Sequence, residues 1–284
     1  MGAPRWMKPA KFAVSTGIYA LTFGWLLTHL RGRATLVRRV ATITAVVLAL
    51  EVALIALQAG RGTTSHFNQT TTLNGWITLS TGVAILTLWV ASIVVAVAVM
   101  RQRFESPALS ASLRWGLGVT ILGAAVGIYM AAPTSSQMDT LRTGVRPAYI
   151  GAHSVGGADG GPGVPVVNWS TEHGDLRVPH FVGLHALQVL PLLGWALARS
   201  RRRSDAQRAR LLHVAGASYA GLTAVLFWQA LRGQPVLEPD ALTWAALGLW
   251  AALTTGAAVA VTRRGVPHGL SSPGRRETGR EASR

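Results

Sequence analysis

The stretch NGWITLSTGVAILTLWVASIVVAVAVM, residues 74–100, decides the fold class because it contains no charged side chain. A helix of about 20 apolar residues crosses the ~30 Å hydrocarbon core of a bilayer. Similar runs recur along this chain of 284 residues, of which 50% are hydrophobic and 13% are charged. Backbone groups in lipid find no water to bond, so each run must be helical. The sequence therefore predicts an all-α, polytopic transmembrane bundle, one domain over residues 1–262, with seven spans at 12–29, 40–58, 74–100, 113–131, 178–198, 210–231 and 241–262.

The positions of the basic residues predict the orientation of the bundle. A net charge of +16 would suggest a nucleic-acid partner for a soluble protein, but in a membrane protein the distribution of charge matters more than its sum. Seven spans place 19 Lys and Arg on the side of the C-terminus and 8 on the other side. The positive-inside rule then predicts a cytoplasmic C-terminus and an outside N-terminus. Arg5, Lys8 and Lys11 would lie outside, which favours the opposite orientation for the first span alone.

Composition also indicates the setting and the tail. The alanine-rich and arginine-rich usage is typical of bacteria, so we expect a multi-pass protein of the bacterial inner membrane, with the lipid bilayer as a partner and no nucleic acid. Residues 263–284 are polar, basic and rich in glycine and serine. We expect them to form a disordered cytoplasmic tail.

Two pairs of similar segments predict an internal repeat. QAGRG at residues 58–62 matches QALRG at 229–233, and KFAVSTGIYALTFGW at 11–25 corresponds to HFVGLHALQVLPLLGW at 180–195. Corresponding spans run the same way across the membrane, which predicts a parallel repeat of three helices. The repeats would cover residues 8–100 and 177–262, with a linker helix at 113–131 and an outer loop at 132–177. Chance agreement between apolar segments is the alternative.

This topology resembles the three-plus-one-plus-three architecture of small transporters with parallel halves, and the resemblance covers topology only. The sequence also resembles an uncharacterised family of bacterial polytopic membrane proteins, in the segments MKPAKFAVSTGIY, SHFN, GGPGVPVVNWS, GDLRVPHF and WQALRGQP. The first resemblance implies an architecture suited to transport. The second implies no particular activity.

Polar residues inside the spans are costly and therefore mark a candidate site. At 1.5 Å per residue, Tyr19, Glu51 and His185 lie at a similar depth, about 10–12 Å below the outer ends of their helices. Helical periodicity places further polar residues on the same faces of these spans. The candidate residues for ligand binding or proton coupling in the spans are Lys11, Tyr19, Glu51, Gln58, Arg177, His185 and Gln188.

The outer loop predicts a cover for that site. After the glycine-rich residues 151–165, the loop combines Trp169 with the polar residues Asn168, Asp175 and Arg177. An interfacial aromatic residue beside donors and acceptors is typical of a lid over the mouth of a bundle. Asp175 can instead cap the helix that follows it.

Three functional classes remain open. The first is binding or transport of a small ligand, with Glu51 or His185 as the proton-coupled group. The second is membrane redox chemistry with a haem or a metal. Because the chain has no cysteine, histidines are the candidate ligands. His180 and His185 lie about 140° apart around a helix and cannot both bind one metal. The third class is a scaffold or assembly protein without a ligand. The candidate metal or haem ligands of the second class are His66, His153, His180 and His185.

Overall fold

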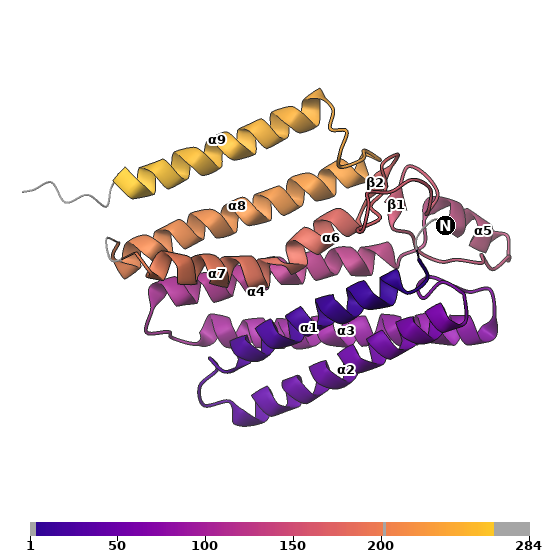
Figure 1. Cartoon of the computed structure of the whole chain (residues 1–284), viewed down its shortest axis with the longest axis horizontal. Helices are drawn as coiled ribbons and strands as arrows, with labels where there is room; N and C mark the ends of the chain where they lie inside the picture. The colour runs from indigo at the N-terminus through magenta and orange to yellow at the C-terminus, as the bar shows by residue number, and fades with distance from the viewer. Residues whose placement is uncertain (1–3, 201–202, 264–284) are drawn as a thin grey trace, which may run out of the picture.

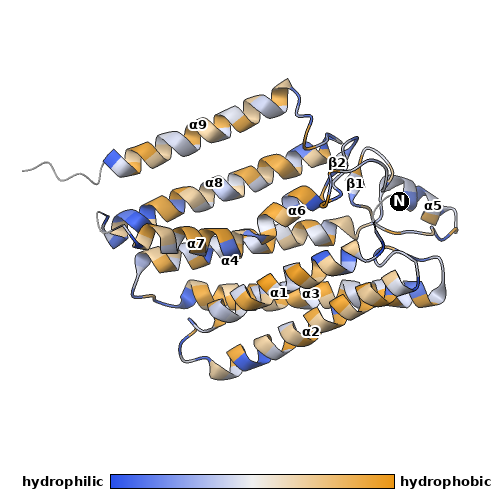
Figure 2. Ribbon diagram, viewed as in Figure 1, coloured by the Kyte–Doolittle hydropathy of each residue, from blue (hydrophilic) through white to orange (hydrophobic). Residues whose placement is uncertain are grey.

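The long helices lie side by side in an elongated bundle (Figure 1). The structure is a computed structural model that describes residues 4–200 and 203–263. Within these residues, seven helical segments are long and apolar enough to cross a membrane, which confirms the helical, seven-segment part of the predicted fold class. Apolar residues run along each of them (Figure 2). The elements in chain order are α1 (Met7–Leu27), α2 (Ala34–Gly60), α3 (Thr72–Arg101), α4 (Pro107–Met130), α5 (Ser135–Arg142), β1 (Ser154–Val155), β2 (Gly174–Asp175), α6 (Arg177–Leu184), α7 (Ala186–Ala198), α8 (Asp205–Leu231) and α9 (Ala241–Arg263).

Several helices begin earlier than the apolar pattern predicts. α4 begins at Pro107 rather than at residue 113, and α8 at Asp205 rather than at residue 210. The side chains of Ser106 and Ser204 cap these two helices by accepting hydrogen bonds from backbone N–H groups of the first turn. The extra turns, PALSAS at 107–112 and DAQRA at 205–209, contain proline, serine and charged or amide side chains, so hydropathy leaves them out of the span although they are helical.

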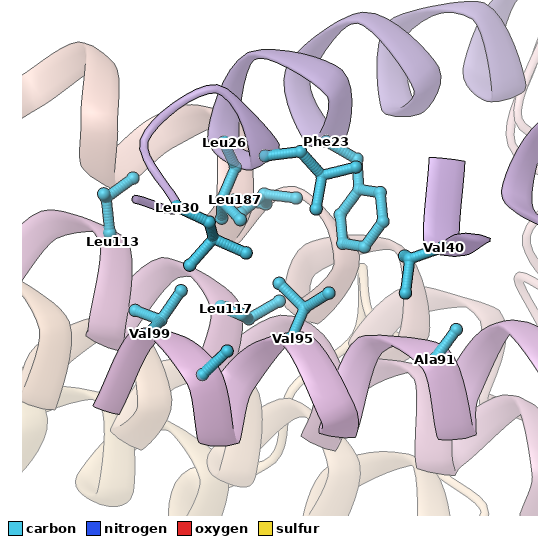
Figure 3. Packing of buried hydrophobic residues seen from close by; sticks show 12 residues of the cluster. Phe23, Leu26, Leu30, Val40, Ala91, Val95, Val99, Leu113, Leu117 and Leu187 are labelled. Atoms are coloured by element: carbon cyan, nitrogen blue, oxygen red, sulfur yellow. The ribbon is translucent and has the colours of Figure 1, made fainter. Parts of the chain in front are cut away.

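α4 lies at the centre of the bundle, where it packs on α3, α6, α7 and α8. α1, α2 and α3 lie to one side of it, and α8 and α9 lie to the other (Figure 1). A buried apolar cluster joins α1, α2 and α3 to α4 and α7 (Figure 3). It includes Phe23 and Leu26 of α1, Val95 of α3, Leu117 of α4 and Leu187 of α7. This core holds α1 against α4 and α7.

The predicted fifth span at 178–198 is two helices rather than one. α6 ends at Leu184 and α7 begins at Ala186, with His185 between them. Pro191, the expected cause of a kink, lies within α7, one turn and a half after the break. A proline disturbs the preceding turn of a helix because it removes a donor and crowds the carbonyl four residues before it. The break therefore falls just before the turn that Pro191 affects.

Side chains from α4 and α8 bond the backbone groups at this break. The Leu187 N–H donates to Thr120 Oγ1 at 3.1 Å, and the Thr120 hydroxyl donates to the Leu184 carbonyl at 3.1 Å. The hydroxyl of Tyr219 donates to the Val182 carbonyl at 2.8 Å. Backbone groups in a bilayer must be bonded within the protein. These two side chains therefore allow α6 and α7 to separate inside an apolar bundle.

α4 and α6 cross at a pair of glycines. A Cβ atom on Gly123 would lie 2.6 Å from the backbone of Gly183, and a Cβ atom on Gly183 would lie 2.5 Å from the Cα of Gly123. Contacts this close require that neither residue carries a side chain. The crossing brings the backbones of the two helices together at the end of α6, next to the break at His185.

The two ends of the bundle differ in chemistry. The loop-rich end carries α5, both strands and the loops at 61–71 and 232–240, and the arginine-rich end carries the loops at 28–33 and 102–106 and the described residues 199–200 and 203–204. α5 and the sheet lie inside the stretch 132–177 that the sequence predicted as a loop. β1 and β2 pair antiparallel, with Ser154 opposite Asp175. The capping box that begins α5, Thr134 with Gln137, is the local signal for that helix.

The direction of the helices agrees with the predicted repeat, which itself stays a prediction. α1 and α6 both begin at the loop-rich end, and α2 and α8 both end there (Figure 1). The predicted disordered tail lies outside the described residues from residue 264 onward.

Candidate functional site

A buried carboxyl group, that of Glu51, lies near the loop-rich end of α2. Glu51 is 4% exposed and lies nine residues before Gly60, at which α2 ends. Within the described part of the chain, neither of its carboxyl oxygens has a hydrogen-bond partner. The nearest opposite group is the Nε2 atom of His66, 3.5 Å from Glu51 Oε1. A buried carboxylate without hydrogen bonds is unfavourable, so this group needs a proton or a cation.

His66 joins Glu51 to a lysine of α1. Lys8 Nζ lies 3.1 Å from His66 Nδ1, and Ser65 Oγ lies 2.8 Å from the same atom. An ammonium group can only donate, so a charged Lys8 makes Nδ1 the acceptor and leaves the proton of a neutral ring on Nε2. The Nε2 atom that carries the proton is the ring nitrogen 3.5 Å from Glu51 Oε1, a distance too long for a hydrogen bond in this arrangement. Lys8, His66 and Glu51 form a line of three polar groups that we call the Lys8–His66–Glu51 triad.

The loop at 61–71 positions His66 through its own side chains. Asn68 is fully buried, and its amide donates to Thr63 Oγ1 at 2.9 Å while its carbonyl oxygen accepts from the backbone N–H of Thr70 at 3.0 Å. Phe67 has a φ of 64°, a left-handed conformation that is strained for an aromatic residue. The rings of His66 and Phe67 meet edge to face, with their centroids 6.1 Å apart and their planes at 74°.

A second histidine, His153, lies beyond Phe67. The rings of Phe67 and His153 are 4.9 Å apart, centroid to centroid. His153 Nδ1 lies 2.9 Å from Asp159 Oδ2, and Asp159 also accepts from the backbone N–H groups of His153 and Ser154. Burial would raise the pKa of Asp159, but these hydrogen bonds and the charge of His153 hold it well below its usual range. Asp159 is therefore ionised and holds His153 in place.

Burial governs the protonation of both histidines in these loops. Burial lowers the pKa of His66 well below 6.5, and the nearby charges of Lys8, His153 and His180 lower it further. Burial also lowers the pKa of His153, although its hydrogen bond to Asp159 opposes that effect. Burial thus favours the neutral form of both imidazoles, in which one ring nitrogen carries no proton.

His180 belongs to the same region but bonds the backbone of α4. Its Nδ1 donates to the Gly123 carbonyl at 2.7 Å, and its ring covers Gly127. In the ranges that the structure describes, no group of three or more histidines, aspartates or glutamates is arranged to hold a metal ion. The predicted metal or haem ligands His66, His153 and His180 thus gather at one end of the bundle as separate, individually bonded side chains.

The other predicted ligands inside the spans bond elsewhere. Tyr19 pairs with Ser92 of α3 at 3.1 Å, and His185 Nδ1 donates to the Phe181 carbonyl of its own helix at 2.8 Å. Gln188 lies 3.3 Å from Thr22 when its amide oxygen faces that hydroxyl. Tyr19 and His185 thus bond residues other than Glu51, and the common depth of the three stays a prediction.

Gln58 lies on the same helix as Glu51, but its side chain forms hydrogen bonds at the end of α2. Its amide donates to Asn74 Oδ1 at 3.1 Å and to the Thr64 carbonyl at 3.3 Å, and Arg61 donates to its carbonyl oxygen. These bonds tie the end of α2 to the start of α3. Gln58 thereby supports the loop that carries His66.

The predicted lid residues form one hydrogen-bonded support over the start of α1. Asp175 is buried and accepts from the backbone N–H of Ser170 at 2.7 Å and from the guanidinium of Arg177. Arg177 also donates to the Asn168 carbonyl at 2.6 Å, and Lys11 donates to the Val166 carbonyl at 2.9 Å. These side chains position the loop above the triad, and their polar groups are engaged in doing so.

Sequence reasoning missed Lys8, Ser65 and Asp159 as members of this region. Lys8 lies three residues before the predicted Lys11, so helical spacing places both on one side of α1. Ser65 and Asp159 lie in loops, where no periodicity indicates a direction. No family model, curated protein or solved structure matches this chain.

Proposed function

We propose that this protein binds a small ligand at the loop-rich end of its bundle and moves it through the membrane, with Glu51 as the group whose charge changes. The buried carboxyl of Glu51, which has no hydrogen-bond partner among the described residues, carries the proposal. An ionisable group at such a position in a span is typically retained for function rather than for stability. Glu51 faces His66, which in turn contacts Lys8, and these two groups can exchange a proton or yield to a cationic ligand.

The separation of α6 from α7 supports movement at this site. Discontinuous helices line the binding sites of many transporters, where two half-helices can move relative to each other. The break at His185 depends on two hydroxyl groups, those of Thr120 and Tyr219, from other helices. A rearrangement of α6 would also move His180 and Arg177, which lie next to the triad and the lid.

The orientation follows from the distribution of basic residues. We propose that the loop-rich end faces the outside and the arginine-rich end faces the cytoplasm of a bacterial inner membrane. Since the chain has no cysteine, single cysteines report their side without background. Glu172→Cys, exposed near the sheet, should react with a membrane-impermeant maleimide on intact cells. Glu105→Cys should react only after lysis, and the reverse pattern would overturn the orientation.

The ligand proposal is tested by a stability screen of the purified chain in detergent. Amino acids, carboxylic acids, amines and divalent cations are added at pH 6 and pH 8, and the unfolding temperature is measured. We expect at least one compound to stabilise the wild type at one pH more than at the other, and to lose this effect in Glu51→Gln. Glu105→Gln is the matched control, since Glu105 is exposed and pairs with Arg31 at the opposite end. A response in Glu51→Gln equal to that of the wild type would remove Glu51 from the site.

The histidine alternative has its own test. Each of His66, His153 and His180 already has a protein partner at Nδ1, which favours a polar network over a redox centre. An absorption spectrum of the purified protein with a Soret band would favour the haem interpretation instead. A chain that responds to no compound and shows no such band would support the third class, a scaffold.

A further inference from the structure

We infer that the imidazole of His66 carries protons between the solvent at the loop-rich end and the carboxyl of Glu51, with Lys8 and Ser65 as the hydrogen-bond partners of its Nδ1 atom. The inference rests on the proposed function, because it assigns the route by which the Glu51 site changes charge. It goes further in naming the proton as the coupled ion and His66 as the residue that admits it.

The geometry of the triad defines a direction. The Nδ1 atom of His66 meets the two outer groups, Lys8 Nζ at 3.1 Å and Ser65 Oγ at 2.8 Å. The Nε2 atom, on the other side of the ring, is 3.5 Å from Glu51 Oε1. Exposure decreases along the same line, since the side chain of His66 is 14% exposed and that of Glu51 is 5% exposed. A proton that reaches Glu51 along this line passes through the ring.

An imidazole in this position can move a proton without becoming a lasting cation. The ring receives a proton at Nδ1 from the Lys8 ammonium and releases the proton of Nε2 to Glu51. One N–H bond forms at Nδ1 while one breaks at Nε2, and an O–H bond forms on the carboxyl. Lys8 is left neutral and regains its proton from water at the loop-rich end. Charge is conserved, because the ion pair of Lys8 and Glu51 becomes two neutral groups.

The surroundings favour a neutral ring between transfers. Burial and the charges around His66 hold its pKa well below 6.5. The ionisable groups that surround the triad come from four segments: Lys8 and Lys11 of α1, Glu51 of α2, His153 and Asp159 of the loop before β2, and Arg177 and His180 of α6. Lys11, Asp159, Arg177 and His180 are engaged with other partners. Among the described residues, His66 is the titratable side chain in contact with the Glu51 carboxyl.

The test measures proton exchange at Glu51 in the full-length protein reconstituted in lipid vesicles. Infrared spectroscopy follows the C=O band of a protonated carboxyl after a pH jump, and its absence in Glu51→Gln assigns the band to Glu51. We expect the band to appear more slowly in His66→Ala, by about 100-fold, the scale of a lost general acid–base group. Added imidazole should restore the rate in His66→Ala by entering the vacated space. His66→Phe fills that space with a ring that has no nitrogen, so imidazole should not rescue it.

Two further variants separate the relay from a loss of structure. His66→Asn retains hydrogen-bonding groups but cannot shift a proton from one side to the other, so it should be as slow as His66→Ala while unfolding at the wild-type temperature. His29→Ala, at the opposite end of the bundle, should exchange at the wild-type rate. Exchange at the wild-type rate in both His66→Ala and His66→Asn would overturn the relay.

The outcomes distinguish the relay from the proposed function. If Glu51→Gln abolishes a ligand response while the His66 variants exchange protons normally, the site stands and the relay is wrong. If the His66 variants slow exchange but Glu51→Gln still responds to the ligand, the relay stands and the ligand lies elsewhere. A wild type that shows no carboxyl band between pH 5 and pH 9 would also overturn the relay.

Discussion

The hydroxyl of Thr120 in α4 lies in the break between α6 and α7, where it accepts a hydrogen bond from the backbone N–H of Leu187 at 3.1 Å. The same hydroxyl donates to the Leu184 carbonyl. One side chain therefore bonds the donor of one half-helix and the acceptor of the other. Thr120 is 2% exposed, so no solvent can replace it.

Removing this hydroxyl should destabilise the bundle. Thr120→Val retains the shape of the side chain but leaves the Leu187 N–H and the Leu184 carbonyl without their partner. A buried unsatisfied polar group costs about 1–3 kcal/mol, so we expect the free energy of unfolding to fall by that amount. Denaturant unfolding in detergent micelles measures it. Thr16→Val is the control, because Thr16 bonds only carbonyls of its own helix and should change stability little. Equal effects of the two substitutions would contradict the role of Thr120.

The hydroxyl of Tyr219 supports the same break from α8. Tyr219→Phe removes its hydrogen bond to the Val182 carbonyl and nothing else of the side chain. We expect a loss of about 1 kcal/mol in the free energy of unfolding and faster hydrogen exchange at residues 183–188. Tyr129→Phe serves for comparison, since Tyr129 is 53% exposed. If hydrogen exchange at the break is unaltered in Tyr219→Phe, the hydroxyl does not stabilise it.

The positions of the spans could be predicted because a long run of apolar side chains marks a segment that lies in lipid, where the cost of unbonded backbone groups requires a helix. The break at His185 could not, because Thr120 and Tyr219 lie far away in the chain and act only after the helices pack. The capping box of α5 is a local signal for a helix. A helix this short contains no long apolar run, so hydropathy alone does not predict it.

The candidate site also divides into residues that the sequence could identify and contacts that it could not. Glu51 could be identified from the sequence because a carboxyl in an apolar span is costly wherever it points. The partner of Glu51 could not be identified from depth, because depth along a helix does not give the direction of a side chain around it. Tyr19 and His185 share the predicted depth but bond other residues. His66 reaches Glu51 because the loop at 61–71 folds back over the end of α2, and that turn depends on Asn68 and on the strained backbone of Phe67.

The crossing of α4 with α6 should tolerate no added methyl group. In Gly123→Ala the new Cβ would lie 2.6 Å from the backbone of Gly183, which cannot move without separating the two helices. Overpacking of this kind costs about 1–3 kcal/mol or more, so we expect a lower unfolding temperature. Gly118→Ala on the same helix is the control, because a Cβ atom added there would meet no other heavy atom within 4 Å. Loss of stability in both variants would point to α4 in general rather than to this crossing.

The support of the lid should depend on Asp175. Asp175→Asn removes the charge that binds Arg177 and turns one acceptor into a donor that faces the Ser170 N–H. Breaking a buried ion pair from one side costs about 3–5 kcal/mol, here confined to the segment around β2. We expect faster hydrogen exchange at residues 166–176 while the spans remain protected. Asp139→Asn, which removes an exposed charge beside Arg142, should leave exchange unchanged. Unchanged exchange in Asp175→Asn would show that the loop is held by other contacts.

The free energy of unfolding should fall as the pH falls below the pKa of an ordinary histidine. The folded pKa of His66 lies well below 6.5, so the unfolded chain takes up a proton on His66 before the folded chain does. The free energy of unfolding therefore decreases from about pH 6.5 downward, by up to about 1.4 kcal/mol per pH unit for this group, until its folded pKa is reached. Unfolding followed by the fluorescence of the 10 tryptophans between pH 5 and pH 7.5 measures the slope. His66→Asn should reduce that slope by about one proton, whereas His29→Asn should not, because His29 lies at the opposite end of α1. A slope that is identical in the wild type and His66→Asn would mean that His66 takes up its proton over the same pH range in the folded and the unfolded chain, and the fold would then not hold the ring neutral as proton transfer to Glu51 requires.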